Sequence, residues 1–138
     1  MPFVLDASIA ACWAFADEDH PAAALALERI RGDEARVPAL WWFEVRNVLV
    51  VNERRGRLTE ADTAAFLRRV SRLGVTIDHS PEEAAVLALA RRHRLSVYDA
   101  SYLELAQREA LPLATLDAEL ARAARAEGVA VLEAEGTS

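Results

Sequence analysis

The feature that most constrains the fold is the alternation of short apolar runs with longer helical patterns along the chain. A continuous apolar run such as Phe3–Leu5 is typical of a strand that is covered on both faces. Such runs, when they alternate with helical patterns, indicate β-α-β units and therefore a parallel sheet. We accordingly predict an α/β fold.

The boundaries of the elements follow from apolar runs, capping residues and glycines. Strands are predicted at Phe3–Leu5, Arg36–Pro38 (a short edge strand), Gly74–Ile77, Leu95–Tyr98, Leu113–Thr115 and Val129–Leu132. Helices are predicted at Ser8–Ala16, Pro21–Arg31, Ala39–Arg55, from Thr59 to about Leu73, from Ser80 to about Arg94, Asp99–Glu109 and Asp117–Ala126. Thr59 is the expected N-cap of its helix, and Ser80 is expected to form a capping box with Glu83.

Length and composition favour one folded domain. The chain has 138 residues, of which 53% are hydrophobic, so it can bury a substantial core. We expect a single domain at residues 1–134, followed by a short polar tail at 135–138. No apolar run reaches the length of a membrane span, no leader pattern opens the chain, and Cys12 is the only cysteine. These features predict a cytoplasmic protein with no membrane partner.

The basic residues exclude several chemistries. All 16 are arginine, so a phosphate-binding loop of the GxxxxGK[ST] type and a Schiff-base lysine are impossible. The nucleophile elbow GxSxG is also absent. The net charge of −6 argues against nucleic-acid binding if taken alone. The argument weakens if four carboxylates hold metal, because the remaining charge is then −6 + 4 = −2.

Three aspartates occupy equivalent positions in the predicted order of elements. Asp6, Asp99 and Asp117 each follow a short apolar run and open a predicted helix. In an open parallel sheet such junctions lie along one edge, which is where ligands bind. The pattern therefore predicts that the three acids meet. The alternative is that each aspartate merely caps its helix, a role that this residue type favours.

Glu44 is predicted to point inward from a long helix. Its helical face carries Leu40, Trp41 and Val48 and no basic residue. A buried charge without a partner costs several kcal/mol, so this carboxylate needs a counter-charge. A divalent cation held by the aspartates would supply it. The alternatives are that Glu44 reaches solvent at the helix rim or pairs with an arginine from another element.

Such a carboxylate cluster suits a hard divalent cation. Crowded carboxylates repel one another and raise each other's pKa unless a cation intervenes. Oxygen ligands with retained waters suit Mg²⁺ or Mn²⁺. A site of this kind can activate a water molecule and stabilise the charge that develops on a phosphodiester. The acids therefore predict a metal-dependent nuclease.

Four segments, in this order and spacing, resemble the PIN-domain ribonucleases and, within them, the VapC toxins of bacterial toxin–antitoxin pairs. The segments are Val4–Ser8, Glu44–Leu49, Tyr98–Ala106 and Leu113–Asp117. The resemblance covers almost the whole chain. It implies a three-layer PIN-like fold with a parallel sheet of about five strands between helices.

The resemblance also implies the roles of particular residues. Asp6, Glu44, Asp99 and Asp117 would form the acidic quartet, bind Mg²⁺ (or Mn²⁺) and carry catalysis, with Asp6 and Asp99 as the core ligands. Its implied activity is that of an endoribonuclease toxin, in which a water attacks a phosphodiester in line and leaves a 5′-phosphate and a 3′-hydroxyl.

Further positions match supporting residues of that family. Ser8 and Thr115 match small hydroxyl positions that hydrogen-bond near the acids, and Asn47 matches a polar position beside the helical glutamate. Glu119 could share the role of Asp117, because the fourth acid varies most in such families.

The expected partners are an RNA substrate, a cognate antitoxin protein and a second copy of the chain. Trp41, Trp42 and Phe43 could stack on RNA bases, but core or interface packing is the favoured interpretation. Two alternatives for the whole chain stay open at this point. One is a PIN-like nuclease of RNA processing or structured DNA. The other is a non-catalytic binding module whose acids are helix caps.

Overall fold

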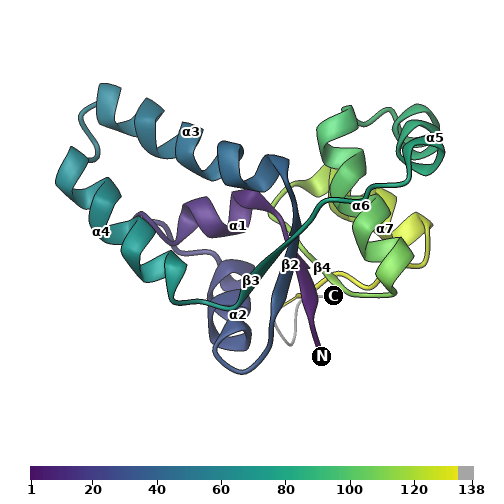
Figure 1. The fold of residues 1–138 in the computed structure, drawn as a ribbon, viewed down its shortest axis with the longest axis horizontal. Coiled ribbons are helices and arrows are strands. Elements are labelled where there is room, and N and C mark those ends of the chain that lie inside the picture. Colours follow the sequence, from purple (N-terminus) through teal and green to yellow (C-terminus); the bar gives the residue numbers. More distant parts are fainter. Residues whose placement is uncertain (134–138) are drawn as a thin grey trace.

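The computed structural model of the chain describes residues 1–133 and shows a parallel sheet between two layers of helices (Figure 1). The strands are β1 (Phe3–Leu5), β2 (Ala35–Pro38), β3 (Val75–Asp78) and β4 (Leu113–Ala114). The helices are α1 (Ala7–Cys12), α2 (Pro21–Ile30), α3 (Leu40–Arg54), α4 (Glu60–Ser71), α5 (Glu83–His93), α6 (Val97–Glu109) and α7 (Ala118–Ala126). The predicted α/β class is confirmed, and the expected tail at 135–138 lies outside the described residues.

The sheet has the order β3-β2-β1-β4, and all of its strand pairs are parallel. Val4 of β1 lies opposite Arg36 on one side and Leu113 on the other, so β1 is central. The prediction that Arg36–Pro38 forms an edge strand is wrong, because β2 lies between β1 and β3. Helices α1 to α4 lie on one side of the sheet in Figure 1, and α5 to α7 lie on the other.

The predicted strand at Leu95–Tyr98 is wrong. The side chain of Ser96 accepts a hydrogen bond from the backbone N–H of Asp99 (3.0 Å) and caps α6, so the last two residues of the run are helical. Val97 and Tyr98 are 50% and 65% exposed, so this apolar run is not buried as a strand would be. The capping hydrogen bond, together with the absence of burial, explains why helix replaces strand here.

The predicted last strand at Val129–Leu132 forms only partly. Val131 makes one isolated parallel bridge to Leu113, and the N–H of Leu132 donates to the carbonyl of Leu113 at 2.9 Å. The sheet therefore has four strands in the described residues, where about five were expected. This incomplete strand and the predicted strand at Leu95–Tyr98 are the two predicted strands that the sheet lacks.

Of the two predicted caps, one is confirmed. Thr59 and Asp62 form a complete capping box at the start of α4. The box expected between Ser80 and Glu83 is wrong, because Glu82 is the N-cap of α5 and its own carboxylate accepts a backbone N–H of the first turn (2.8 Å). The first turn of α5 is therefore satisfied without Ser80.

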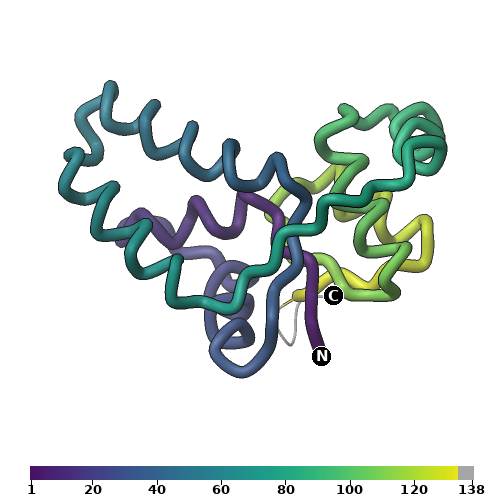
Figure 2. The backbone as a smooth tube through the Cα atoms, in the orientation of Figure 1, coloured from purple at the N-terminus to yellow at the C-terminus, as the bar shows by residue number. Residues whose placement is uncertain are grey.

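Helices α3 and α4 form an antiparallel pair that extends away from the sheet, as the backbone trace shows (Figure 2). The turn between them contains Gly56 at φ 76°, a conformation that glycine adopts without steric cost. Because α3 starts two residues after β2 ends, Glu44 lies in the second turn of the helix, near the sheet. None of the helices in residues 1–133 combines the length and the apolar character that crossing a bilayer requires.

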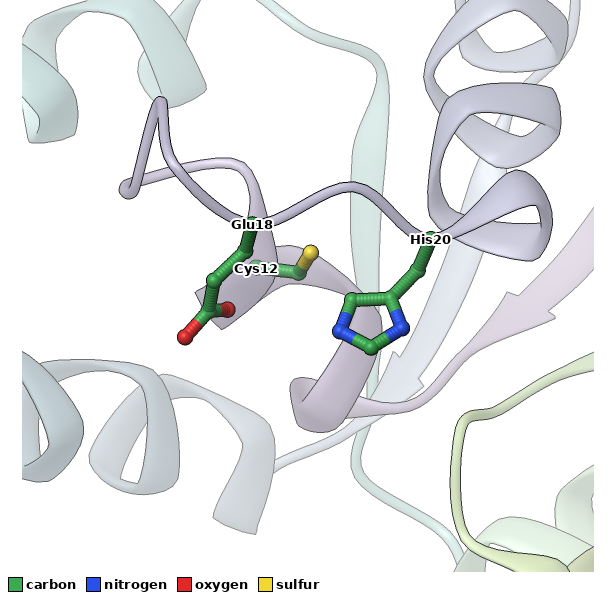
Figure 3. Close-up of side chains that lie close together, drawn as sticks. All are labelled: Cys12, Glu18 and His20. Carbon is green, nitrogen blue, oxygen red and sulfur yellow. The ribbon is translucent and has the colours of Figure 1, made fainter.

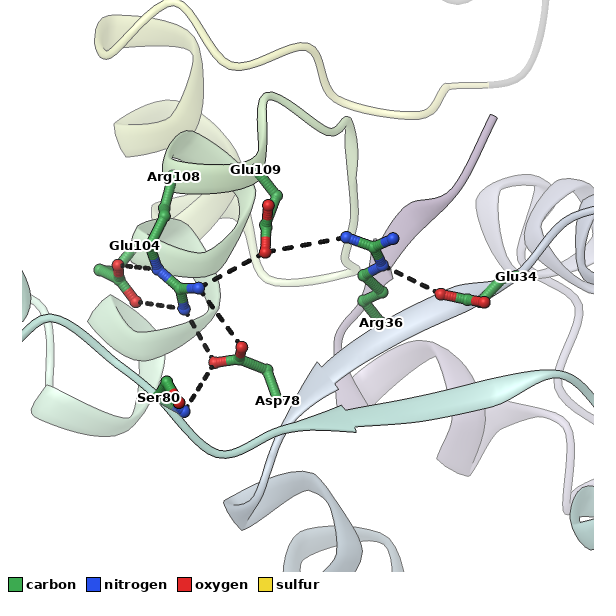
Figure 4. A network of polar contacts seen from close by, with 7 residues as sticks. All are labelled: Glu34, Arg36, Asp78, Ser80, Glu104, Arg108 and Glu109. Atoms are coloured by element: carbon green, nitrogen blue, oxygen red, sulfur yellow. Dashed lines mark hydrogen bonds and ion pairs between the residues drawn. The ribbon is translucent and has the colours of Figure 1, made fainter.

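An ion-pair network ties α6 to the sheet (Figure 4). Arg108 donates to Glu104 (2.7 Å) and to Asp78 at the end of β3 (2.8 Å), and it lies 3.5 Å from Glu109. Glu109 in turn lies 3.7 Å from Arg36 of β2. Glu104 is only 2% exposed, so its charge depends on this arginine. The network helps to fix the helix that carries Asp99.

Candidate metal centre

A hollow of about 270 Å³ lies where the carboxyl ends of the central strands meet the helices. Its lining consists of Asp6, Ala7, Ser8, Glu44, Asn47, Val48, Asp99 and Asp117. All four predicted acids therefore line one pocket. The lining contains no basic side chain, so the carboxylates have no counter-ion from the pocket wall.

The sheet topology explains why distant residues meet here. Asp6 directly follows β1, and Asp117 follows β4, its hydrogen-bonded neighbour. The chain reaches β2 and β3 on one side of β1 and β4 on the other, which makes the β1–β4 boundary a switch point of the sheet. Ligands of open α/β sheets bind at such points, because the connections leave in opposite directions and open a crevice. The backbone N–H of Asp6 donates to Ala114 (3.0 Å), so the register is fixed.

Two hydroxyl groups orient Asp6, which is 5% exposed. Ser8 Oγ (2.8 Å) and Thr115 Oγ1 (2.6 Å) both donate to the same oxygen, Oδ2 of Asp6. Ser8 Oγ accepts the N–H of Leu116 (3.0 Å), and Thr115 Oγ1 accepts the N–H of Asp117 (3.0 Å). Each hydroxyl thus links Asp6 to the segment between β4 and α7. The other oxygen of Asp6 takes no part in these two bonds.

Glu44 is half-buried and accepts a hydrogen bond from Tyr102 Oη at 2.6 Å. Tyr102 is completely buried, so its phenol is a fixed donor. Glu44 therefore meets a phenol rather than an arginine. We predicted no role for Tyr102 from the sequence. The feature that could have indicated one is its spacing of three residues from Asp99, which places both side chains on one face of α6.

The aspartates differ in their relation to the helices. Asp117 caps α7, since its Oδ1 accepts two backbone N–H groups of the first turn. Asp6 precedes α1 but makes no capping hydrogen bond to it, and Asp99 lies inside α6 after the true cap, Ser96. Glu119 is exposed and does not line the pocket. The helix-cap interpretation therefore holds for Asp117 and fails for Asp6 and Asp99.

The electrostatics of the pocket favour a cation. Burial raises the pKa of Asp6, of Glu44 and of Asp99, and negative charge on neighbouring acids raises each pKa further. The hydroxyl bonds to Asp6 and the phenol bond to Glu44 act in the opposite direction. Because the ionised forms are crowded and lack a basic partner in the lining, a divalent cation fits this set of oxygen donors.

The four carboxylates line the pocket, but their oxygens are not clustered tightly. In residues 1–133, no three of these carboxylates bring oxygens within 4.8 Å of one another. Direct contact of three of these carboxylates with one ion would therefore require side-chain rotation from the positions seen here.

Residues 3–126 match the family model of the PIN domain, so the chain belongs to the PIN-domain family. The chain is 33% identical over 124 residues to Ribonuclease VapC3 of Pyrobaculum aerophilum, a match that covers 88% of this chain and 93% of that protein. The predicted resemblance to PIN-domain proteins of the VapC type is thereby confirmed.

Two solved structures share the fold. PAE2754 from Pyrobaculum aerophilum superposes with a TM-score of 0.73 at 25% identity, over 96% of this chain and 90% of that one. FitAcB from Neisseria gonorrhoeae superposes with a TM-score of 0.68 over 99% of this chain and all of the other. Its identity is 15%, so this second likeness concerns the fold alone.

Proposed function

We propose that this protein is a Mg²⁺-dependent endoribonuclease that acts as the toxin of a toxin–antitoxin pair. The observation that carries the proposal is the pocket at the β1–β4 switch point, lined by four carboxylates and no basic residue. Membership of the PIN-domain family and similarity to Ribonuclease VapC3 support the choice of RNA as substrate.

The residues of the pocket have different proposed roles in a metal-assisted hydrolysis. Asp6 and Asp99 are the proposed core ligands for Mg²⁺, or Mn²⁺, with Glu44 and Asp117 completing the acidic set. A bound ion would supply charge neutralisation at the scissile phosphate and lower the pKa of a coordinated water. The hydroxyls of Ser8 and Thr115 hold the Asp6 carboxylate in place, as the phenol of Tyr102 holds Glu44. One of the acids would orient the attacking water.

RNA cleavage by the purified chain tests this function. Wild-type protein should cut RNA with Mg²⁺ and not with a chelator, leaving 5′-phosphate ends. Glu44→Gln should lose at least about a hundredfold in rate, the size expected when a positioned acid–base or electrostatic group is removed. Glu28→Gln, which changes an exposed glutamate on α2, is the matched control and should cleave normally. Metal binding without any cleavage would leave a binding module as the better description.

We propose that an antitoxin tail inhibits by placing an arginine among the acids. A chain of net charge −6 with an acidic pocket attracts cations, and a guanidinium can bind a carboxylate through two hydrogen bonds. Tail and Mg²⁺ should then compete for the same negative charge. The test measures inhibition by a tail peptide at rising Mg²⁺ and constant ionic strength. An inhibition constant that is independent of Mg²⁺ would place the tail elsewhere.

We further propose a cytoplasmic homodimer. Large apolar side chains remain exposed in the described chain, with Phe43 68%, Tyr98 65% and Trp42 43% exposed. Trp42 and Phe43 also contact each other edge to face, with ring centroids 5.0 Å apart. Trp41 is buried and belongs to the core. Exposed aromatic side chains that lie close together favour a protein contact surface over solvent exposure.

A further inference from the structure

Outside the acidic pocket, three potential metal ligands of different chemical types meet at the junction of α1 and α2 (Figure 3). The Sγ of Cys12, a carboxylate oxygen of Glu18 and an imidazole nitrogen of His20 all lie within 4.8 Å of one another. Among residues 1–133, no other group of three or more His, Cys, Asp or Glu side chains meets this separation. No zinc motif marks these residues in the sequence, because Cys12 is the only cysteine.

The fold fixes the two ends of this cluster. Cys12 is the last residue of α1 and is 5% exposed, whereas His20 is the residue immediately before α2. The side chain of His20 makes no capping hydrogen bond to α2, so its imidazole is not engaged by the helix. Glu18 and His20 are both exposed, which leaves a path for an ion from solvent to the buried thiol.

The connecting segment is also held between its ends. Trp13 Nε1 donates to the carbonyl of Ala23 (2.8 Å) and joins the end of α1 to α2. Phe15 is buried under Arg57, whose Cζ lies 4.2 Å from the ring centroid. The Nη2 of Arg57 also lies 3.6 Å from Oε1 of Glu18. Packing therefore sets the path of the loop that carries Glu18 and His20 after Cys12 at the end of α1.

The sulfur, nitrogen and oxygen donors of this cluster favour Zn²⁺. Tetrahedral Zn²⁺, with bonds of about 2.3 Å to sulfur and about 2.0–2.2 Å to nitrogen and oxygen, separates its donor atoms by about 3.4–3.6 Å. Side-chain rotation can reach this spacing from a cluster within 4.8 Å. Thiolate and imidazole suit Zn²⁺ and other borderline or soft ions, whereas Mg²⁺ prefers oxygen. Asp19 adds negative charge near Cys12.

We propose that Cys12, Glu18 and His20 form a Zn²⁺ site with one coordination position open to water. The site is separate from the acidic pocket, because none of its ligands lines that pocket. The two sites differ in donor chemistry, because one combines sulfur, nitrogen and oxygen and the acids of the other offer oxygen alone. This proposal does not depend on the proposed nuclease activity.

Co²⁺ substitution tests the site on the full chain. Co²⁺ bound by a thiolate gives an intense charge-transfer band in the near ultraviolet, which carboxylate ligands do not give. We expect this band in the wild type and its loss on addition of Zn²⁺. Cys12→Ser should abolish the band. His20→Ala and Glu18→Gln should each weaken Co²⁺ affinity at least tenfold.

Two controls separate this site from the rest of the molecule. Asp99→Asn alters the acidic pocket and His79→Ala removes an exposed histidine beyond β3, and both should keep the band and the affinity. A wild-type spectrum without the band, or a band that survives Cys12→Ser, would overturn the proposal. If Cys12→Ser fails to fold, His20→Ala carries the test, and an unchanged affinity in that variant would reject the site.

Discussion

Asp6→Asn should increase the stability of the metal-free protein at neutral pH while it abolishes cleavage. Asp6 is 5% exposed and burial raises its pKa, so the ionised side chain destabilises the folded state. Both hydroxyl hydrogen bonds fall on one oxygen, Oδ2. The amide oxygen of asparagine can occupy that position and keep both bonds, while the charge disappears.

The size of the effect follows from the pKa. Each unit by which folding raises the pKa of Asp6 above its ordinary value of 3.8 costs about 1.36 kcal/mol once the group is ionised in both states. Wild-type stability is therefore lost as pH rises from 3.8 through the raised pKa, and the advantage of Asp6→Asn grows over the same window. Asp6→Ala removes the acceptor and leaves two hydroxyl donors unpaired, at a cost of about 1–3 kcal/mol.

Thermal melting in a chelator, from acid pH to about pH 8, measures these differences. In a domain of this size 1 kcal/mol corresponds to roughly 3–5 °C in Tm. Asp6→Asn should melt above the wild type at the upper end of the range, and Asp6→Ala should melt below Asp6→Asn throughout. RNA cleavage is assayed on the same preparations. The reasoning would be refuted if Asp6→Asn lost as much stability as Asp6→Ala at every pH. It would also be refuted if Asp6→Asn cleaved RNA at the wild-type rate.

Three further predictions concern other parts of the fold. Tyr102→Phe removes the phenol that donates to Glu44 at 2.6 Å, and it should cost roughly 1–2 kcal/mol in urea unfolding and slow RNA cleavage; an unchanged rate would show that this bond does not position Glu44. Arg108→Met leaves the carboxylates of Glu104 and Asp78 without their cationic partner. It should lower the free energy of unfolding in urea by about 3 kcal/mol. The proposed homodimer should appear in sedimentation at micromolar concentration, and a clean monomer would contradict it.

Part of the site was readable from the sequence. A strand followed by Asp6, and a helical face with Glu44 among apolar neighbours, are local patterns that depend on a few adjacent residues. The structure places both side chains in one pocket with Asp99 and Asp117. Asp99 was predicted to follow a strand, but it lies in the first turn of α6 behind its cap. Asp99 lines the pocket because α6, which carries it, packs against β1 and β4.

Local sequence patterns determined the α/β class, most of the helices and the acids that deserve testing, because periodicity and capping act over one or two turns of chain. Only the tertiary structure decided which side chains meet. The bond between Tyr102 and Glu44 joins residues 58 positions apart, and the cluster of Cys12 with His20 depends on how the loop between α1 and α2 packs. These contacts follow from strand order and loop packing. No short stretch of sequence encodes strand order or loop packing, since both depend on the burial of the whole core.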